Sequence, residues 1–415
     1  MNLIKARLGL MMFLEYVVWG TWYVTIGTWL SSTRHFSGQQ VGLVYSTTAV
    51  GAIVAPFFVG LIADKLFATE KVLAALHFMG GLLLFAAVRQ ESFVAIYTIL
   101  LLHCCCFMPT MALTNALAFR HIRDPKAEFG PIRVMGTTGW IVIGLIVGKL
   151  RIEATATPLL LGGVVSIVMG IYCLTLPHTP PLARDGKLSL GNLFPREALT
   201  LLKERSMAIF AVASFLVCVP LTFYFSFTNV FLNQTGVQNA AGKMTAGQMS
   251  ELFCMLLIPF FFRRLGVKYM LAAGMVAWIM RYALFAYGNA ETRVWMFWLG
   301  ILLHGICYDF FFVTGQIYID RKAPPALRSS AQGLIAFITL GMGMFFGSWL
   351  SGVTVDYFSS HNAGGALVHD WRGIWLVAGA ASAVVLVLFL LFFHEKEQEE
   401  EVVSAASEPM AGIPL

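Results

Sequence analysis

The sequence has few charged residues: Asp, Glu, Lys and Arg together make up 12% of its 415 positions. A soluble globular domain carries about 25%, and disordered chains and nucleic-acid-binding proteins depend on charge even more. The net charge of +6 does not alter this exclusion, because basic loops beside a membrane have their own explanation. Apolar residues make up 58% of the chain. The composition indicates a polytopic membrane protein and excludes a nucleic-acid partner.

Metal-binding and catalytic motifs are also missing. The seven cysteines lie in apolar runs without the spacing of a zinc site, so we expect no metal, no cofactor and no disulfide framework. Neither HExxH nor GxSxG occurs, and no enzyme activity is predicted. A membrane enzyme or sensor is kept only as a distant alternative. The first apolar stretch lacks a small-residue cleavage site, which predicts an uncleaved first helix.

Long apolar runs are what the sequence has in abundance. A helix that crosses the ~30 Å hydrocarbon core of a bilayer needs about 20 predominantly apolar residues. The runs predict twelve spans, near residues 9–31, 40–62, 71–89, 93–119, 131–149, 157–177, 207–233, 244–262, 269–288, 293–318, 329–355 and 371–393. The longest connection, 178–206, is rich in Pro, Gly and charge and divides the spans six and six. An even number of spans places both termini on one side of the membrane.

Lys and Arg residues are distributed unequally between the two sides. Of the 28, twenty fall on the side of the N-terminus and one, Arg281, lies within a span. The seven on the opposite side are Arg34, Arg89, Lys149, Arg151, Lys243, Arg293 and Arg372. Because cytoplasmic loops carry the excess of basic residues, both termini are predicted to be cytoplasmic. The Glu-rich tail is expected to be solvated there.

The two halves of the chain resemble each other. At a constant offset of 201 residues, His103 corresponds to His304 and Arg120 to Arg321. Parallel repeats of six helices are typical of secondary transporters, whose binding site lies between the halves. The predicted fold is therefore all-α. It consists of an N-terminal six-helix bundle (1–177), a cytoplasmic linker (178–206), a C-terminal six-helix bundle (207–394) and an acidic cytoplasmic tail (395–415).

Several segments carry a family resemblance. GLIADKLFATEK (Gly60–Lys71) resembles the Gly-x-Leu-x-Ala-Asp signature of the major facilitator superfamily, although no Gly follows Asp64. Within that superfamily, FLEYVVWGTWYVTIGTWL, PIRVMGTTGW, GQMSELF, YDFFFVTG and LRSSAQG resemble, in order, blocks of the bacterial nucleoside:proton symporter (nucleoside permease) family. The resemblance implies the major facilitator fold and proton-coupled nucleoside uptake across the bacterial inner membrane. It also implies alternating access, with the site at the midplane between the bundles.

Polar residues within the spans mark the candidate site. A charge at the centre of a bilayer costs at least about 2.5 kcal/mol and normally faces a cavity or a partner. Residues three, four or seven positions apart share a helix face. By this rule, five spans present polar and aromatic stripes, which hold Glu15, Trp19 and Trp22; Arg133, Thr137 and Trp140; Thr222, Phe225 and Asn229; Gln248 and Glu251; and His304 and Tyr308 beside Asp309. Two further acids, Asp320 and Asp356, lie at span ends and are expected to be solvated.

A nucleoside suits such stripes, because its hydroxyls donate to carboxylates, its base edge bonds Gln or Arg, and its flat face stacks on aromatic rings. The resemblance implies that Arg133, Thr137, Gln248 and Glu251 bind substrate and that Asp309 is the essential acid. The predicted substrate site is Glu15, Trp19, Arg133, Thr137, Trp140, Thr222, Phe225, Gln248, Glu251, His304, Tyr308 and Asp309. Asp309 is the first choice for proton coupling and Glu251 the second.

Departures from the family's pattern leave base selectivity open. Thr222 and Phe225 stand where amide side chains are expected, and His304 stands where the family has Tyr. The expected co-substrates are a uridine-like nucleoside and a proton, carried by a monomer surrounded by lipid. Proton-coupled transport of sugars or another small polar metabolite is the main alternative. A drug/proton antiporter is disfavoured, because the fifth span lacks that group's Gly-Pro-rich motif.

For several single residues, the sequence also allows a structural role instead of substrate binding. Arg133 could anchor a helix end or form an ion pair with Glu251 or Asp309, and Glu15 could form a buried hydrogen bond instead of lining a cavity. A structural or interfacial role is expected for Arg281, and packing roles are expected for His77 and His103. Asp64, Lys65 and Arg120 are predicted contacts of a cytoplasmic gate.

Overall fold

The computed structural model describes residues 3–58, 67–181, 198–361 and 367–394. The helices of the first half form one group, called here the N group. They are α1 (Leu3–Trp22), α2 (Ile26–Ser32), α3 (Gly38–Phe58), α4 (Thr69–Val88), α5 (Phe93–His121), α6 (Pro125–Leu150) and α7 (Thr157–Cys173). Within this group α1 packs on α6 and α7, α4 packs on α7, and α5 packs on α3 and α4.

The second half forms the C group. Its elements are the 3-10 helix η3 (Ala198–Lys203), α8 (Arg205–Gln234), α9 (Ala240–Tyr287), α10 (Val294–Leu302), α11 (His304–Tyr308), the π-helical turn η4 (Asp309–Val313), α12 (Thr314–Lys322), the 3-10 turn η5 (Pro325–Leu327), α13 (Arg328–Ala336), the π-helical turn η6 (Phe337–Gly343), α14 (Met344–Tyr357), the strands β1 (Ser359–His361) and β2 (Leu367–His369), and α15 (Trp371–Phe392). Here α9 packs on α10, α11 and α15, and α8 packs on α14 and α15.

Every predicted span lies on helix in the described part of the chain, and the all-α prediction is confirmed. Eight continuous helical stretches of the described residues are long and apolar enough to cross a membrane. The antiparallel pair β1–β2, which joins α14 to α15, was not predicted. Of the predicted linker 178–206, residues 182–197 lie outside the described residues, as does the predicted tail 395–415.

Several spans are interrupted where the sequence suggested continuous helices. The first predicted span is broken between α1 and α2, at residues 23–25. The eighth and ninth spans run together as α9, which bends at Gly266, where φ is +63°. Glycine tolerates this backbone conformation because it has no Cβ. The tenth span contains η4 and the eleventh contains η6, and π-helical turns of this kind occur frequently at functional sites.

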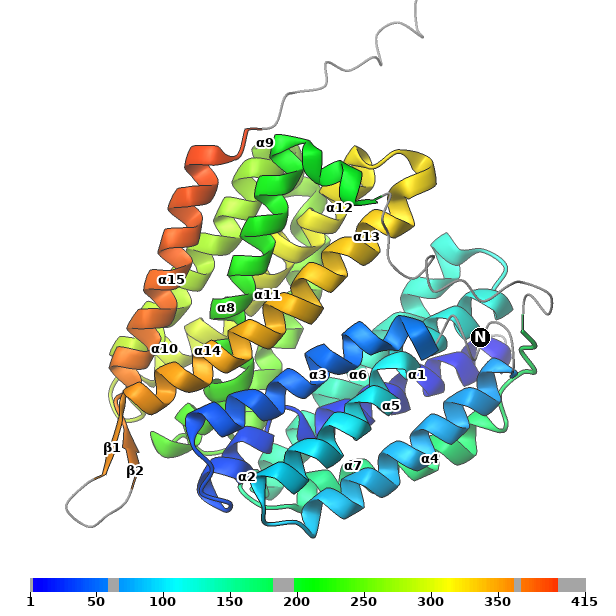
Figure 1. The fold of residues 1–415 in the computed structure, drawn as a ribbon, viewed down its shortest axis with the longest axis horizontal. Helices are drawn as coiled ribbons and strands as arrows, with labels where there is room; N and C mark the ends of the chain where they lie inside the picture. The colour runs from blue at the N-terminus through cyan, green and yellow to red at the C-terminus, as the bar shows by residue number, and fades with distance from the viewer. Residues whose placement is uncertain (1–2, 59–66, 182–197, 362–366, 395–415) are drawn as a thin grey trace, which may run out of the picture.

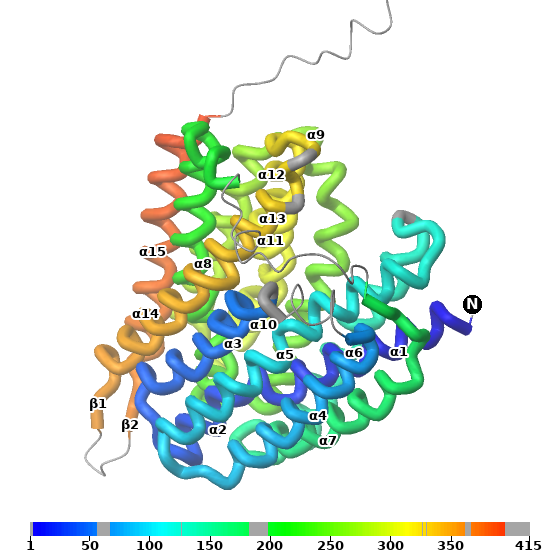
Figure 2. The backbone as a smooth tube through the Cα atoms, turned by 45° about the vertical axis from the view of Figure 1, so that its right-hand side comes forward, coloured from blue at the N-terminus to red at the C-terminus, as the bar shows by residue number. Residues whose placement is uncertain are grey.

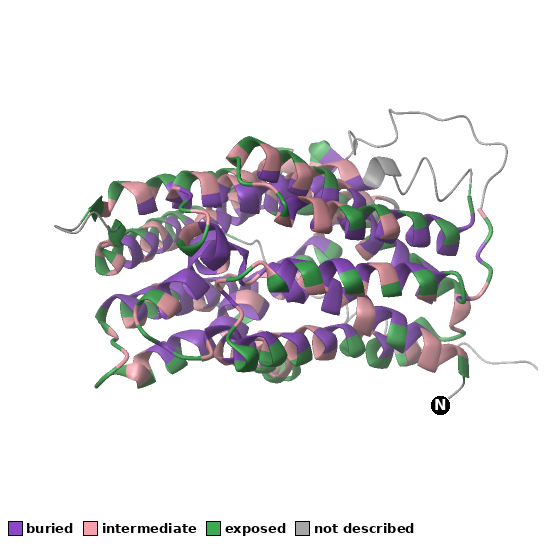
Figure 3. Ribbon diagram, turned by 90° about the horizontal axis from the view of Figure 1, so that it is seen from below, coloured by how far each residue is buried: buried purple, intermediate pink, exposed green. Residues whose placement is uncertain are grey.

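Buried residues lie inside each group and exposed residues on its outer surface, as the view from below shows (Figure 3). Many of the exposed residues are large and apolar, among them Leu82, Leu256 and Leu391, which are 62%, 79% and 62% exposed. An exposed apolar surface of this extent would be a liability in water. It is the surface that a helix bundle presents to lipid tails.

The N and C groups lie side by side and diverge toward one end of the molecule (Figures 1 and 2). The packing between them runs along two helix pairs, α3 with α14 and α6 with α9, with α2 also against α8. Glycines allow the closest approach: a Cβ on Gly42 of α3 would collide with the carbonyl oxygen of Ser348 on α14. The groups therefore meet mainly along these helices and at one end.

That end is called the closed end, and it carries the ends of α1, α6 and α14 and the starts of α3 and α9. Thr28 Oγ1 donates to Asn229 Oδ1 across it, at 2.6 Å. Asp356 accepts hydrogen bonds from the backbone at the start of α3, so the expectation that it is simply solvated was wrong. The opposite end, called the open end, carries the start of α1 and the end of α15. Among the described residues at this end, the ion pairs lie within one group, such as Lys5 with Glu128 at 2.8 Å and Lys322 with Glu204 at 2.6 Å.

Candidate functional site

A cavity of about 460 Å³ lies between the N and C groups. Its size falls in the range of small-molecule sites, about 300–1,000 Å³. Ten of the twelve predicted substrate residues line it: Trp19, Arg133, Thr137, Trp140, Phe225, Gln248, Glu251, His304, Tyr308 and Asp309. The other two, Glu15 and Thr222, do not. Side chains of both groups therefore converge on one hollow, which has an aromatic wall and a few polar groups.

The N-group side of the cavity is formed largely by α1 and α6. Arg133, Thr137 and Trp140 follow one face of α6, one turn apart. The Arg133 guanidinium lies 4.4 Å from the centroid of the Tyr16 ring on α1, a cation–π contact. Among the described residues Arg133 forms no ion pair, neither with Glu251 nor with Asp309. Its charge is therefore available to a ligand in the cavity.

The C-group side presents a carboxylate held by an imidazole. Glu251 Oε1 lies 2.8 Å from His304 Nε2, and the Glu251 side chain is 22% exposed whereas that of His304 is 2% exposed. The His304 ring stacks on Tyr224, with centroids 4.8 Å apart. Gln248 lies one turn before Glu251 on α9. A ligand can thus reach Glu251 and Gln248 together, while His304 fixes the carboxylate from behind.

Asp309 is the first residue of the π-helical turn η4. It lines the cavity, yet only 1% of the residue is exposed. Neither of its carboxylate oxygens has a hydrogen-bond partner among the described residues. An ionised carboxylate without partners is costly in such surroundings, and binding a proton removes the charge. Of the two acids that line the cavity, Asp309 is thus the one whose carboxylate has no partner among the described residues.

Aromatic rings close the cavity toward the closed end. Trp19 and Trp140 meet edge to face, with centroids 5.3 Å apart, and Tyr23 lies 5.4 Å from Trp19. Tyr23 of the N group also contacts Phe225 of the C group, with centroids 6.2 Å apart. These rings offer flat surfaces on which a planar group can stack.

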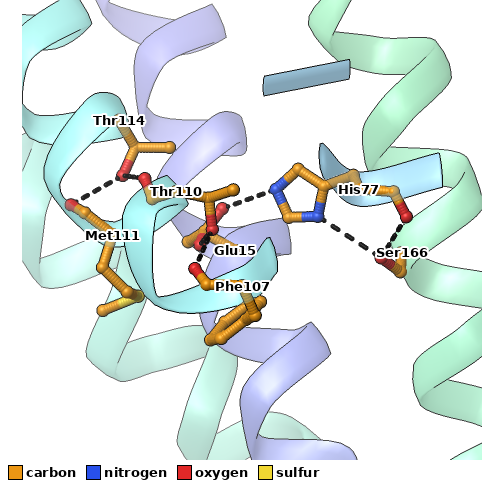
Figure 4. A network of polar contacts seen from close by, with 7 residues as sticks. All are labelled: Glu15, His77, Phe107, Thr110, Met111, Thr114 and Ser166. Carbon is orange, nitrogen blue, oxygen red and sulfur yellow. Dashed lines mark hydrogen bonds and ion pairs between the residues drawn. The ribbon is translucent and has the colours of Figure 1, made fainter. Parts of the chain in front are cut away.

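Glu15 lies in a buried polar network behind the cavity wall (Figure 4). Its carboxylate lies 2.9 Å from His77 Nε2 and accepts a 2.6 Å hydrogen bond from Thr110 Oγ1. Glu15 is fully buried, and the His77 ring is within 3.4 Å of Ser166 Oγ. The network joins α1, α4, α5 and α7 and does not reach the cavity. Glu15 therefore forms buried hydrogen bonds instead of lining the cavity.

We expect Glu15→Ala to lower the free energy of unfolding by about 3–5 kcal/mol, because it leaves His77 and Thr110 buried without their partner. The Michaelis constant for substrate should change less than about twofold. Thermal unfolding in detergent and uptake kinetics measure the two effects. The matched control is Glu128→Ala, which breaks the more exposed pair with Lys5 and should leave the unfolding temperature nearly unchanged. A stable Glu15→Ala variant with weakened substrate affinity would contradict this assignment.

Thr222 and the predicted gate residues lie elsewhere. Thr222 is fully buried, and its hydroxyl donates to the Val219 carbonyl at 2.7 Å. Arg120 is exposed at the open end, where its guanidinium donates to the Pro180 carbonyl at 2.7 Å. Asp64 and Lys65 lie outside the described residues. The predicted cytoplasmic gate thus stays a prediction.

Sequence reasoning missed cavity residues from several elements. Tyr16, Tyr23, Thr48, Met108 and Phe312 line the cavity but were not predicted. Tyr16 lies on α1 three residues before Trp19, and Tyr23, which directly follows α1, comes four residues after Trp19. The spacing rule therefore contained the signal for both tyrosines. The part of the chain that the structure describes holds no group of three or more potential metal ligands.

Arg281 lies close behind this site. It is fully buried on α9, its Nε donates to the Gly300 carbonyl at 3.0 Å, and its guanidinium lies 4.1 Å from the Tyr224 ring centroid. Its Nη atoms have no hydrogen-bond partner among the described residues. It contacts the same Tyr224 ring that stacks on His304. Arg281 thus lies behind the wall and does not line the cavity.

Comparison with known proteins relates this chain to a family of transporters. Residues 1–398 match the model of the nucleoside H+ symporter family. YegT of Escherichia coli strain K12 is 42% identical over 381 residues, covering 89% of each chain. The nucleoside permease NupG of the same organism is 32% identical and covers 91% of this chain and 92% of its own. A crystal structure of the nucleoside transporter NupG superposes with a TM-score of 0.87 at 32% identity, over 95% of this chain and all of the other.

Proposed function

Since the chain belongs to the nucleoside H+ symporter family, whose members are membrane transporters of the major facilitator fold and not enzymes, we propose that it accumulates nucleosides by alternating access. It works as a monomer in the cytoplasmic membrane of a bacterium. The two moving bodies are residues 1–177 and 207–394, joined by the linker 178–206. The observation that carries the proposal is the cavity of about 460 Å³ between the groups, lined by polar and aromatic residues of both.

The orientation follows from the basic residues. By the predicted spans, twenty of the 28 fall on the side of the N-terminus, which is therefore assigned to the cytoplasm, and the end of α15 lies on the same side. The closed end then faces outward and the open end faces the cytoplasm. In this orientation the structure corresponds to the inward-facing state of the transport cycle.

Substrate binding uses residues from both groups. We assign the ribose hydroxyls to Glu251, because an ionised carboxylate accepts hydrogen bonds from hydroxyl donors. Gln248, Arg133 and Thr137 are assigned to hydrogen-bond the edge of the base, and the face of the base stacks on the aromatic wall. A ligand that bonds both groups at once draws them together. It therefore favours a state in which the cavity is enclosed.

Proton coupling is assigned to Asp309. An empty site with an ionised Asp309 resists enclosure, because closing removes water from an unpaired charge. A proton taken from the outer side neutralises the carboxylate and allows the loaded halves to pass to the inward-facing state. Release of proton and nucleoside into the cytoplasm follows. Glu251 is the second candidate, although its carboxylate already has a partner in His304 Nε2, at 2.8 Å.

Uptake of labelled uridine into proteoliposomes tests the substrate class. Unlabelled uridine and adenosine should compete with the label, because both present a ribose and a flat base to the same residues. Free ribose and maltose should compete at least ten times more weakly, since they offer no base to Gln248 and the aromatic wall. Equal competition by sugars would instead favour the sugar symporter.

A further inference from the structure

Two carboxylates cross the closed end in opposite directions, each to the first turn of a helix in the other group. Asp356, in the last turn of α14, accepts from the backbone N–H of Gly38 at 2.5 Å and of Gln39 at 2.8 Å, at the start of α3. Glu153, which follows α6, accepts from the backbone N–H of Ala241 at 3.1 Å, at the start of α9. The two are called here the crossing carboxylates.

Glu153 makes further bonds from its second oxygen. Oε2 accepts from the side-chain amides of Asn229 at 2.8 Å and Asn233 at 2.9 Å, both near the end of α8. Asn229 in turn accepts from Thr28 of the N group. Glu153 is only 4% exposed, so its charge depends on these donors for compensation. These three donors, Ala241, Asn229 and Asn233, all belong to the C group.

The arrangement is repeated by the internal symmetry of the chain. The offset of 201 residues that relates the two halves carries Gly38 to Asn239, the N-cap of α9, and carries Glu153 to position 354, two residues before Asp356. The helix pairs involved, α3 with α14 and α6 with α9, are the two along which the groups pack. The same contact therefore occurs twice, once in each direction.

Helix N-termini explain the choice of carboxylates. The first N–H groups of a helix have no partner within it, and they carry a partial positive charge. Asn239 at the N-cap of α9 makes no capping hydrogen bond of its own, and in α3 the Ser37 hydroxyl bonds only Gln40 N. Each helix thus leaves N–H groups for an acceptor from the other group. Charge-assisted hydrogen bonds of this kind are roughly twice as strong as neutral ones.

These contacts exist only while the closed end is shut, because each joins the N group to the C group. A contact that is made in one state and lost in the other shifts the equilibrium between them. We propose that Glu153 and Asp356 are the outer gate of this transporter, a matched pair that holds the outward route closed while the site faces the cytoplasm. This inference rests on the alternating access proposed above, and it adds gate residues that lie outside the substrate cavity.

The test measures the separation of the two groups at the closed end. Spin labels on Glu91→Cys of the N group and Glu291→Cys of the C group report it by double electron–electron resonance, since both residues are exposed in loops at that end. Cys105 is replaced by Ser, because it is half-buried whereas the other six cysteines are buried. Glu153→Gln and Asp356→Asn are each introduced, and then combined. Each substitution should raise the ratio of the long-distance population to the short-distance population about tenfold, and the double variant should raise this ratio further.

Asp370→Asn is the matched control. Asp370 also lies at the closed end and caps a helix, but the helix is its own: its carboxylate accepts from Gly373 N at 3.1 Å at the start of α15. Its loss should leave the distance distribution unchanged. Asn233→Ala provides a milder variant, which removes one donor to Glu153 and should shift the ratio in the same direction.

Unchanged distances in the folded double variant would overturn the proposal, as would an equal shift in Asp370→Asn. Should Glu153→Gln fail to fold, Asp356→Asn and Asn233→Ala decide between the same outcomes. The measurement needs neither nucleoside nor proton gradient. If the distances shift as expected but the protein fails to transport nucleosides, the gate is supported and the proposed substrate is contradicted.

Discussion

Replacing Asp309 by Asn should abolish gradient-driven accumulation of nucleoside while leaving nucleoside exchange across the membrane in place. Asparagine keeps the size of the side chain but cannot gain or lose the proton that the cycle requires. With a gradient of one pH unit, a symporter that moves one proton per nucleoside can sustain about tenfold accumulation. The variant should reach only equal concentrations on both sides. Proteoliposomes loaded with unlabelled nucleoside measure the exchange that remains.

Asp320→Asn is the matched control for this experiment. Asp320 follows eleven residues later on α12, but its side chain is 56% exposed and lies 3.8 Å from Arg328. Its replacement should leave accumulation unchanged. The assignment of Asp309 is wrong if Asp309→Asn accumulates nucleoside as the unmodified protein does. In that event Glu251→Gln becomes the next variant to test, because Glu251 is the other acid that lines the cavity.

The second large effect concerns substrate affinity. Arg133→Ala should weaken nucleoside binding about 10- to 100-fold, because it removes hydrogen bonds from a charged donor worth about 1.5–3 kcal/mol. Gln248→Ala should weaken it about 3- to 10-fold, since a neutral hydrogen bond is worth about 0.5–1.5 kcal/mol. Binding of nucleoside to the purified protein, measured by calorimetry, gives both values directly.

Two adjacent threonines provide the control for these variants. Thr137 lines the cavity, whereas Thr138 does not and its hydroxyl donates to the Val134 carbonyl at 3.0 Å. Thr137→Ala should weaken binding and Thr138→Ala should not. Unchanged affinity in both Arg133→Ala and Gln248→Ala would assign these side chains to the helix framework. The cavity would then bind its substrate through other residues.

The fold could be predicted largely from hydrophobic length. Runs of about 20 apolar residues are strong signals, and each predicted span lies on helix in the described chain. The interruptions could not be predicted in the same way. The break after Trp22 and the π-helical turns at Asp309 and Phe337 leave composition almost unchanged, because they alter only how backbone hydrogen bonds are paired.

The site shows what spacing alone can and cannot determine. In the first predicted span, residues 15, 19 and 22 and residues 16, 19 and 23 fit the same helical rule. The structure has the second set in the cavity wall, while Glu15 turns toward His77. The choice depends on a histidine 62 positions away, which spacing along one helix cannot reveal. On α6 no such ambiguity arises, because no second set of polar and aromatic residues at helical spacing competes with Arg133, Thr137 and Trp140.

The crossing carboxylates were missed for a related reason. Glu153 and Asp356 lie where spans end, and charged residues at span ends are usually solvated. Both accept from backbone N–H groups of distant helices, more than 80 residues away for Glu153 and more than 300 away for Asp356. Backbone donors carry no sequence signature. Only the arrangement of the two groups shows that these carboxylates have partners.

The central claim, proton-driven nucleoside uptake, is tested most directly by labelled uridine in proteoliposomes under an inward proton gradient, with and without a protonophore. The account predicts that uridine accumulates above its external concentration and that the protonophore returns it to the external level. Uptake that reaches the same level with and without the gradient would contradict the account.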